Sequence, residues 1–325
     1  MPTLLVNGRM SPALAARVQA AVSQRQGATA QRRPLKSLLR LFTVAFLVTA
    51  AVGIVQFRQR RQLELDTTRA ALRAKLRDAG RSLTRADREL PARVEAAIAL
   101  DAAPGYVGDR IAGDLRNEAG FKAALSLPTL YLRGPLEALA HPARVSELAS
   151  SSSPDAFVLC LLAPPETRTE KALRLKASAA YAQGPSMQAT AAVLRLAPLL
   201  QALPLLGADW KSRVELADTM PALQTLEKLI DAAPLAVAVR AAKARQLLVV
   251  LDESRAATGP TELDGERAHP VRVVLTDLTN GDVRLRFRGA VDPSWLSDQS
   301  RAQYASGIDS CALAMDLRAA VRLSE

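Results

Sequence analysis

Apolar residues are concentrated in one uninterrupted stretch near the start of the chain. From Leu41 to Phe57 the sequence holds seventeen residues without a charge, and only Thr43, Thr49 and Gln56 among them are polar. As a helix this stretch is about 26 Å long, and the leucines just before it bring it near the roughly 30 Å hydrocarbon thickness of a bilayer. A core helix of a soluble protein usually keeps a polar face, which this run lacks. We therefore predict a single transmembrane helix over residues 37–57.

Heptad spacing follows directly after the predicted span. Leucine and alanine alternate at intervals of four and three residues until Pro91, with charged residues between them, and this pattern predicts a juxtamembrane amphipathic helix over residues 58–90. Its apolar positions include Leu65, Leu72, Leu76, Leu83 and Leu90. One hypothesis is a short coiled coil that forms a homodimer through residues 63–90, although the alanines and Arg69 in the seam would weaken it. The alternative is a single helix whose leucine stripe packs on its own domain.

Beyond residue 91 the pattern changes to mixed α/β. Short apolar runs predict strands at 127–132, 155–162 and 246–251, and alanine-rich stretches predict helices at 135–149, 166–183, 187–203, 210–243 and, with a break near Gly307, 294–323. We expect residues 91–325 to form one α/β domain with a small mixed sheet and helices on its faces.

The clearest local signal in this domain is a β-hairpin. Apolar runs at 271–278 and 283–287 flank Asn280-Gly281, a dipeptide that favours a tight turn. Alternation in the second run predicts that Val283, Leu285 and Phe287 are buried and that Arg284, Arg286 and Arg288 face solvent. These arginines either receive an anionic partner or form a solvated face that discourages edge-to-edge association.

Net charge adds to this picture because it is unevenly distributed. The chain carries +11 overall, but residues 1–90 hold seventeen Lys and Arg against five Asp and Glu, and residues 91–325 hold twenty-six against twenty-seven. The excess therefore flanks the predicted span, where it can interact with anionic headgroups. Aromatic residues make up only 4% of the chain, so stacking platforms are scarce. We expect no nucleic-acid partner.

The basic residues also predict an orientation. Residues 1–40 contain seven Lys and Arg and no Asp or Glu, which favours retention of the tail, residues 1–36, in the cytoplasm. We predict a protein of the bacterial inner membrane, with the domain in the periplasm. Cleavage as a signal peptide at the small residues near Ala50 is the alternative, but that site lies inside the apolar run.

Two cysteines, Cys160 and Cys311, leave several hypotheses open. In an oxidising compartment they could form one disulfide, and otherwise both are small buried hydrophobic residues. A periplasmic redox sensor is a third hypothesis. Neither cysteine belongs to a Cys-x-x-Cys pair, so a thiol oxidoreductase is not indicated.

Other catalytic signals are weak. The chain has only two histidines, His141 and His269, and no Gly-x-Ser-x-Gly, Ser-x-x-Lys or phosphate-binding glycine motif. The loop after the strand at 246–251 contains five acidic residues that could hold a divalent cation, but their spacing matches no calcium loop; they are Asp252, Glu253, Glu262, Asp264 and Glu266. We predict no metal and no cofactor.

These observations favour a single-pass anchored interaction or scaffolding protein of a bacterial cell-envelope complex over an enzyme. The alternative is a membrane-anchored hydrolase whose site is built from dispersed carboxylates, such as Asp252, with His141 or His269.

Overall fold

The computed structural model describes residues 5–6, 9–10, 12–152, 155–182, 192–253 and 268–322. The chain divides into two compact units, Met1–Thr68 and Arg69–Glu325, which are considered one at a time.

The first unit is dominated by the long helix α1, Pro12–Ala79, preceded by the two-residue strands β1, Leu5–Val6, and β2, Arg9–Met10. The side chains of the apolar run are exposed, with Phe42 at 71% and Phe46 at 72%. Within the described residues, one helical segment, Leu41–Ala79, is long and apolar enough to cross a membrane. The structure therefore supports the predicted membrane span. The tail after residue 12, predicted as a separate segment, is part of the same helix.

The predicted juxtamembrane helix ends earlier than its heptad pattern suggests. α1 stops at Ala79, and the chain turns before α2, Arg85–Arg88, and α3, Leu90–Asp101. The side chain of Thr84 accepts from the Asp87 N–H while the Asp87 carboxylate accepts from the Thr84 N–H, so a capping box starts a new helix. The prediction of one helix to residue 90 was wrong because this start signal and Gly80 outweigh the heptad spacing.

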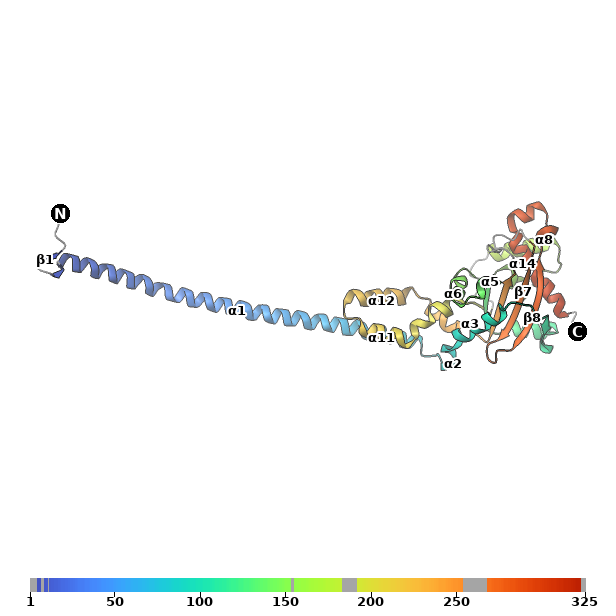
Figure 1. The fold of residues 1–325 in the computed structure, drawn as a ribbon, viewed down its shortest axis with the longest axis horizontal. Helices are drawn as coiled ribbons and strands as arrows, with labels where there is room; N and C mark the ends of the chain where they lie inside the picture. Colours follow the sequence, from blue (N-terminus) through green and yellow to red (C-terminus); the bar gives the residue numbers. More distant parts are fainter. Residues whose placement is uncertain are drawn as a thin grey trace. The chain divides into compact units, whose positions relative to one another are not determined.

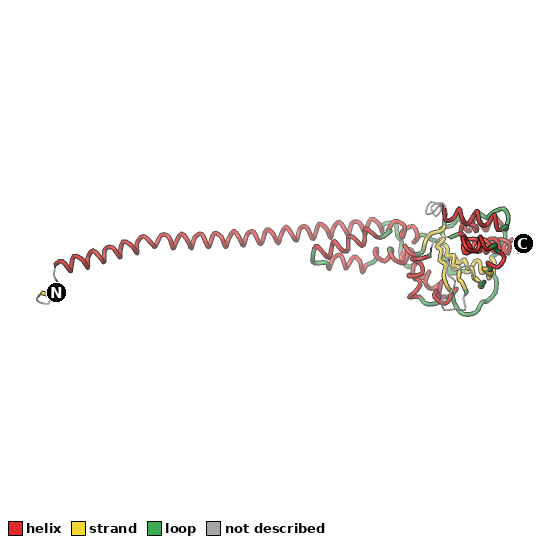
Figure 2. The backbone as a smooth tube through the Cα atoms, turned by 90° about the horizontal axis from the view of Figure 1, so that it is seen from above, coloured by secondary structure: helices red, strands yellow, loops and turns green. Residues whose placement is uncertain are grey.

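Most of the leucine stripe packs within the second unit. Leu72, Leu76, Leu83 and Leu90 are all buried in this chain, whereas Leu65 belongs to the first unit and is half-buried. The end of α1 lies beside the hairpin of α11, Ala208–Leu216, and α12, Met220–Ala232 (Figures 1 and 2). Polar contacts hold it there: Lys75 pairs with Asp231, Arg73 with Glu215, and Arg69 donates to the Ala217 carbonyl. Residues 72–90 therefore adopt the alternative of packing on their own domain.

A six-stranded mixed sheet forms the centre of the second unit, in the order β3-β8-β7-β6-β4-β5. β4 pairs in parallel with both β5 and β6, and the remaining neighbours are antiparallel. The strands are β3 Arg110–Ile111, β4 Thr129–Pro135, β5 Val193–Arg195, β6 Gln246–Asp252, β7 His269–Asp277 and β8 Val283–Val291. The predicted α/β class with a small mixed sheet is confirmed.

Helices cover both faces of the central strands. Alternate residues of β4 and β6, namely Tyr131, Leu248 and Val250, belong to one apolar core with four helices. These helices are α4 Glu118–Leu125, α7 Ala156–Leu162, α8 Glu170–Ala182 and α14 Asp298–Arg322. Their neighbours Leu130 and Val249 are equally buried but point to the opposite face. There α3, α5 (Leu136–Leu139) and α6 (Pro142–Ser151) contact the strands. Because β4 and β6 are covered on both sides, their sequences are continuous apolar runs rather than alternating ones.

The run at 155–162, predicted as a strand, is a helix. α7, Ala156–Leu162, begins where the Asp155 carboxylate accepts from the backbone N–H groups of Phe157, at 3.0 Å, and Val158, at 3.3 Å. A short run of apolar residues does not distinguish a strand from a helix buried on most of its surface, and the aspartate before it is an N-cap. The prediction was wrong because it gave the apolar run more weight than the cap.

The other helices follow the predicted regions with interruptions. Residues 192–203 were predicted as helix but include β5, whereas the predicted residues 187–191 lie outside the described part of the chain. The last helix is α14, continuous across the predicted break at Gly307. The remaining helices are η1 Gly113–Leu115, α4 Glu118–Leu125, α5 Leu136–Leu139, α6 Pro142–Ser151, α8 Glu170–Ala182, α10 Ala197–Gln201, η2 Leu203–Leu206, α13 Leu235–Ala241, η3 Pro293–Trp295 and α14 Asp298–Arg322.

The predicted hairpin is confirmed as β7 and β8, which lie side by side in Figure 1. Its loop is longer than a two-residue turn, because the Asp277 N–H donates to the Asp282 carbonyl, and Gly281 has a φ of +80°. A bulge opposes Leu275 to Leu285 but Thr276 to Val283, so Arg284 has no partner in β7. The predicted alternation therefore holds only from Leu285 onward.

Gly289 is required for the contact between β8 and α14. A Cβ atom at this position would lie 2.6 Å from Leu313 Cδ1 and 2.8 Å from Phe287 Cε1. We expect Gly289→Ala to lower the free energy of unfolding by about 1–3 kcal/mol, because packed cores resist added volume. Urea denaturation of the full-length protein in detergent, followed by tryptophan fluorescence, measures this change.

Gly113→Ala is the matched control, since a Cβ there meets nothing within 4 Å, and its effect should stay within about 0.5 kcal/mol. Equal effects of the two substitutions would contradict the packing argument.

Candidate functional site

A buried cluster of charged side chains lies at the carboxyl ends of the parallel strands β4 and β6. Arg133 is near the end of β4, and Asp252 is the last residue of β6, opposite Pro135. Both side chains point to the face covered by α7 and α14, since each is two residues along from a residue of that core. Adjacent parallel strands therefore place an arginine and an aspartate within reach of each other, diagonally across the pair.

The Arg133 guanidinium is bound by three side chains, from β6, from the N-cap of α7 and from α14. Its Nε and Nη2 donate to the two carboxylate oxygens of Asp252, at 3.1 and 3.0 Å, which makes a bidentate pair. Nη1 donates to Asp155 Oδ2 at 3.2 Å and to the Ser310 hydroxyl of α14 at 2.6 Å. The backbone N–H of Arg133 donates to the Ser152 hydroxyl at 3.0 Å. The cluster therefore joins two strands to the beginning of α7 and the middle of α14.

His269 completes the cluster from the antiparallel strand β7. Its Nε2 lies 3.1 Å from Asp252 Oδ1, and the side chains of His269, Asp252, Asp155 and Arg133 are all less than 9% exposed. Burial alone would raise the pKa of Asp252, but the Arg133 charge and the His269 hydrogen bond outweigh it and hold that pKa below its ordinary value. Burial likewise opposes the Arg133 charge, and the two aspartates hold its pKa above its ordinary value.

The two histidines of the hydrolase alternative are separated by the fold. His141 is exposed, at the residue that precedes α6, whereas His269 meets Asp252. An aspartate that orients a histidine is one part of a general-base dyad. Here both carboxylate oxygens already bind Arg133, and the Ser310 hydroxyl bonds to Arg133. This arrangement is better suited to holding elements together than to moving a proton.

The disulfide lies on the same pair of helices. Cys160 of α7 and Cys311 of α14 are bonded, with their Cα atoms 5.2 Å apart, and both are completely buried. It therefore joins two helices, not a strand and a helix. Because both sulfur atoms are enclosed, exchange with an external thiol requires α7 and α14 to separate first.

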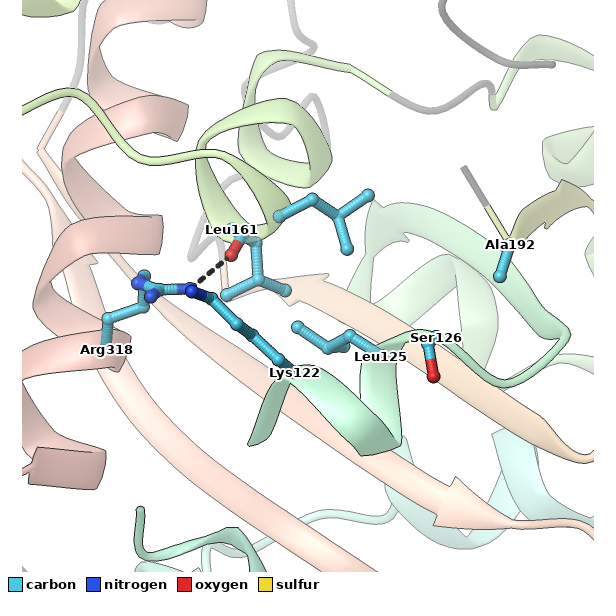
Figure 3. Close-up of a pocket in the computed structure, with 7 residues that line it drawn as sticks. Lys122, Leu125, Ser126, Leu161, Ala192 and Arg318 are labelled. Carbon is cyan, nitrogen blue, oxygen red and sulfur yellow. Dashed lines mark hydrogen bonds between the residues drawn. The ribbon is translucent and has the colours of Figure 1, made fainter. Parts of the chain in front are cut away.

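A separate cavity of about 290 Å³ lies at the ends of α4 and α7 (Figure 3). It is lined by Lys122, Leu125, Ser126, Leu161, Leu162, Ala192 and Arg318. Arg318 Nη1 donates to the Leu161 carbonyl at 2.7 Å and its Nη2 pairs with Glu118, while Lys122 Nζ lies 3.3 Å from the same Glu118. The two cations therefore compensate the carboxyl ends of the helices, and the Ser126 hydroxyl donates to Ala123.

The three arginines of β8 have different surroundings. Arg284 pairs with Asp114 of η1. Arg288 Nη2 lies 2.6 Å from Glu253, and its guanidinium stacks on the Tyr106 ring at 5.5 Å from the centroid. Arg286 acts electrostatically on Asp101 and Tyr106. Arg284 and Arg288 thus already carry carboxylate partners from this chain.

Asp101 is a buried carboxylate on the same side of the sheet as Arg286. It ends α3 with 8% of its surface exposed, and its Oδ2 lies 3.4 Å from the Thr276 hydroxyl. Burial raises the pKa of Asp101 to about 7, although the Arg286 charge and the Thr276 hydrogen bond act in the opposite direction. Between about pH 4 and pH 7 this carboxyl group is therefore mostly neutral in the folded protein, whereas an exposed aspartate is ionised.

The described residues bear on the two sequence hypotheses of a metal site and an acidic cation-binding loop. These residues include no group of three or more His, Cys, Asp or Glu side chains placed to hold a metal ion. Glu262, Asp264 and Glu266 of the acidic loop lie outside the described residues, and Glu253 bonds to Arg272 and Arg288.

Sequence reasoning missed Arg133, which organises the cluster. We ended the predicted strand at Leu132, immediately before it. An arginine directly after a run of apolar strand residues is a signal for a buried partner, because a charge in that setting is almost always paired.

Comparison with known proteins gives no relative: no protein family matches the chain, and no curated protein and no solved structure is similar to it. Conclusions about function therefore depend on the residues described above.

Removal of one partner from the cluster should be strongly destabilising. We expect Asp252→Asn to lower the free energy of unfolding by about 3–5 kcal/mol, because the buried Arg133 charge loses its bidentate partner. Urea denaturation of the full-length protein measures the loss. Glu89→Gln, which removes the exposed Arg85–Glu89 pair, is the control and should cost less than about 0.5 kcal/mol. Similar values for the two variants would contradict the structural role of the cluster.

Asp101 predicts a dependence of stability on pH. Because its pKa is raised from 3.8 to about 7 on folding, the folded state holds a proton that the unfolded state releases. As the pH rises from about 4 to about 7, the free energy of unfolding of the wild type should therefore fall relative to that of Asp101→Asn. The total decrease should be a few kcal/mol, at about 1.4 kcal/mol for each pKa unit. Denaturation at several pH values measures the difference between the two proteins.

Asp218→Asn, at an exposed position, is the control, and it should differ little from wild type at each pH. A constant difference between wild type and Asp101→Asn from pH 4 to pH 8 would contradict the argument.

Proposed function

We propose that this chain is a single-pass membrane protein of a bacterial cell envelope, and that its α/β domain is an interaction or scaffolding module of an envelope complex. The observation that carries the proposal is the combination of two features. The first is an apolar helix with exposed side chains. The second is a domain in which the charged side chains Arg133 and Asp252 are bound to one another in the interior. A protein built in this way is suited to presenting a surface at a membrane.

Two independent observations support a location of the domain outside the cytoplasm. The first forty residues carry seven basic and no acidic side chains, which favours their retention on the cytoplasmic side. The bond between Cys160 and Cys311 is typical of proteins in oxidising compartments. We therefore propose the inner membrane, with a cytoplasmic N-terminus and a periplasmic domain.

The arrangement of the charged groups favours a module over an enzyme. A catalytic acid or base needs access to substrate, but Arg133, Asp252 and His269 are buried. The described cavity is lined by apolar residues and by cations that are engaged with helix ends and Glu118.

A hydrolase is the second candidate, and one observation favours it. Asp252 and His269 are 3.1 Å apart, although seventeen residues separate them in the sequence. If Arg133 moved away, the pair would have the composition of a general-base dyad.

Replacement of the anchor tests the main proposal. Three forms are compared in bacterial cells: the native chain, a chain with residues 37–57 exchanged for an unrelated transmembrane helix, and a chain without residues 1–57. We expect the first two forms to be crosslinked to the same neighbouring proteins by formaldehyde and the third to lose them, because the domain supplies recognition and the helix supplies location. Mass spectrometry of the crosslinked species measures this result.

Two controls accompany this experiment. Protease added to spheroplasts should digest the domain, and non-reducing peptide mapping should recover the Cys160–Cys311 peptide pair. A protected domain, or the same neighbours for all three forms, would contradict the proposal. Turnover by the purified full-length protein on a panel of ester, amide and phosphate substrates, lost in His269→Gln, would favour the hydrolase instead.

A further inference from the structure

Within the described residues, one edge of the central sheet is only partly covered. β8 pairs with β7 along its length, but on its other side β3 supplies just two partners, Arg110 opposite Arg286 and Ile111 opposite Leu285. Beyond them the Arg288 N–H donates to the Asp109 carboxylate at 3.0 Å. Among the described residues, none pairs with the backbone of β8 on this side after Arg288.

The hydrogen-bonding groups of Ala290 point to this open edge. The Arg284 carbonyl and the Arg288 N–H both bond on the β3 side, and backbone groups of a strand alternate between its two edges, so those of Ala290 share that direction. Its neighbour across the pair is Pro270, which has no N–H to offer. Ala290 and Asp292 are exposed, and Asp292 keeps extended backbone angles, φ −138° and ψ 100°.

Two copies of this edge segment are complementary in charge when they pair antiparallel. In an antiparallel pairing of Arg288-Gly289-Ala290-Val291-Asp292 centred on Ala290, each arginine lies opposite an aspartate and each glycine opposite a valine. The side chains of Arg288 and Asp292 project on the same face, because both lie an even number of residues from Ala290. Opposite charges placed across a strand pair are favourable, and alanine at the centre lets the two backbones approach.

We propose that two copies of the chain join through this edge, with the β8 strands antiparallel about a two-fold axis at Ala290. Each Ala290 N–H would donate to the Ala290 carbonyl of the second copy, and the backbone of Arg288, whose N–H already donates to the Asp109 carboxylate, takes no part in the pairing. Such an interface is isologous, so the same segment serves both partners.

The groups needed for the charge pairs are present. The Arg288 guanidinium uses Nη2 for Glu253, which leaves other N–H donors, and the Asp292 carboxylate accepts from Ser294 but has about four lone-pair sites on its two oxygens. The segment is short, but copies anchored in one membrane meet at a high effective concentration. This interface replaces the predicted seam at 63–90, whose leucines from Leu72 onward are buried in their own domain.

Substitutions at Ala290 test the backbone pairing in the full-length protein. Ala290→Pro removes the central donor without removing a hydrogen bond to β7, and Ala290→Thr keeps the donor as the matched control. We expect Ala290→Pro to weaken the dimer association constant about tenfold or more and Ala290→Thr to preserve it, because two backbone hydrogen bonds are lost only in the first. Sedimentation equilibrium in detergent and single-molecule photobleaching in native membranes measure the dimer fraction.

A pair of charge-reversal substitutions provides a second test, in which each variant controls for the folding of the other. Arg288→Glu and Asp292→Arg should each prevent self-association, since each places like charges opposite one another. Co-expressed with different tags, the two variants should co-purify, because every facing pair then has opposite charge. Ala290→Cys should be joined by a short bismaleimide in membranes, and Leu175→Cys, exposed on α8, should not.

Three results would overturn the proposal. These are a dimer unaffected by Ala290→Pro, failure of the two charge variants to co-purify, and a chain that is monomeric in native membranes at every density. Crosslinking of Leu65→Cys in the absence of crosslinking at position 290 would assign the interface to α1 instead.

Discussion

The bidentate pair between Arg133 and Asp252 is the interaction on which the arrangement of the domain depends. It connects the ends of two parallel strands, and its remaining donors reach Asp155 and Ser310. A charge so deeply buried is tolerable only when each of its donors is matched. The cost of removing these groups from water is offset by the charge-assisted hydrogen bonds, and these bonds require α7 and α14 to lie where their polar residues meet the guanidinium.

The disulfide and the charged cluster act on the same two helices from neighbouring positions. Cys160 lies five residues after Asp155 on α7, and Cys311 directly follows Ser310 on α14. The covalent bond limits the separation of the helices, while the hydrogen bonds fix their direction relative to the strand ends. Both features lie in the interior of the domain.

The unequal distribution of charge connects this domain to its location. The basic excess lies in the first ninety residues, around a helix whose side chains are exposed. The remaining chain is close to neutral, and Arg284 and Arg288 each meet a carboxylate of their own domain. A strongly basic chain therefore need not recognise an acidic partner, because its positive charge can interact with anionic lipid headgroups instead.

The sequence by itself determined the features that depend on neighbouring residues. An unbroken apolar run predicted the membrane span, alternation and Asn280-Gly281 predicted the β7–β8 hairpin, and the apolar segment at 246–251 predicted a strand, because each signal is local in period or turn chemistry. Tertiary structure decided the rest. The run after Asp155 became a helix because its cap and its burial on most sides outweighed strand-like composition. The leucines from Leu72 found partners in their own domain, and Arg133 met Asp252 across 119 residues, because apolar surface and buried charge are satisfied by whichever groups the fold brings near.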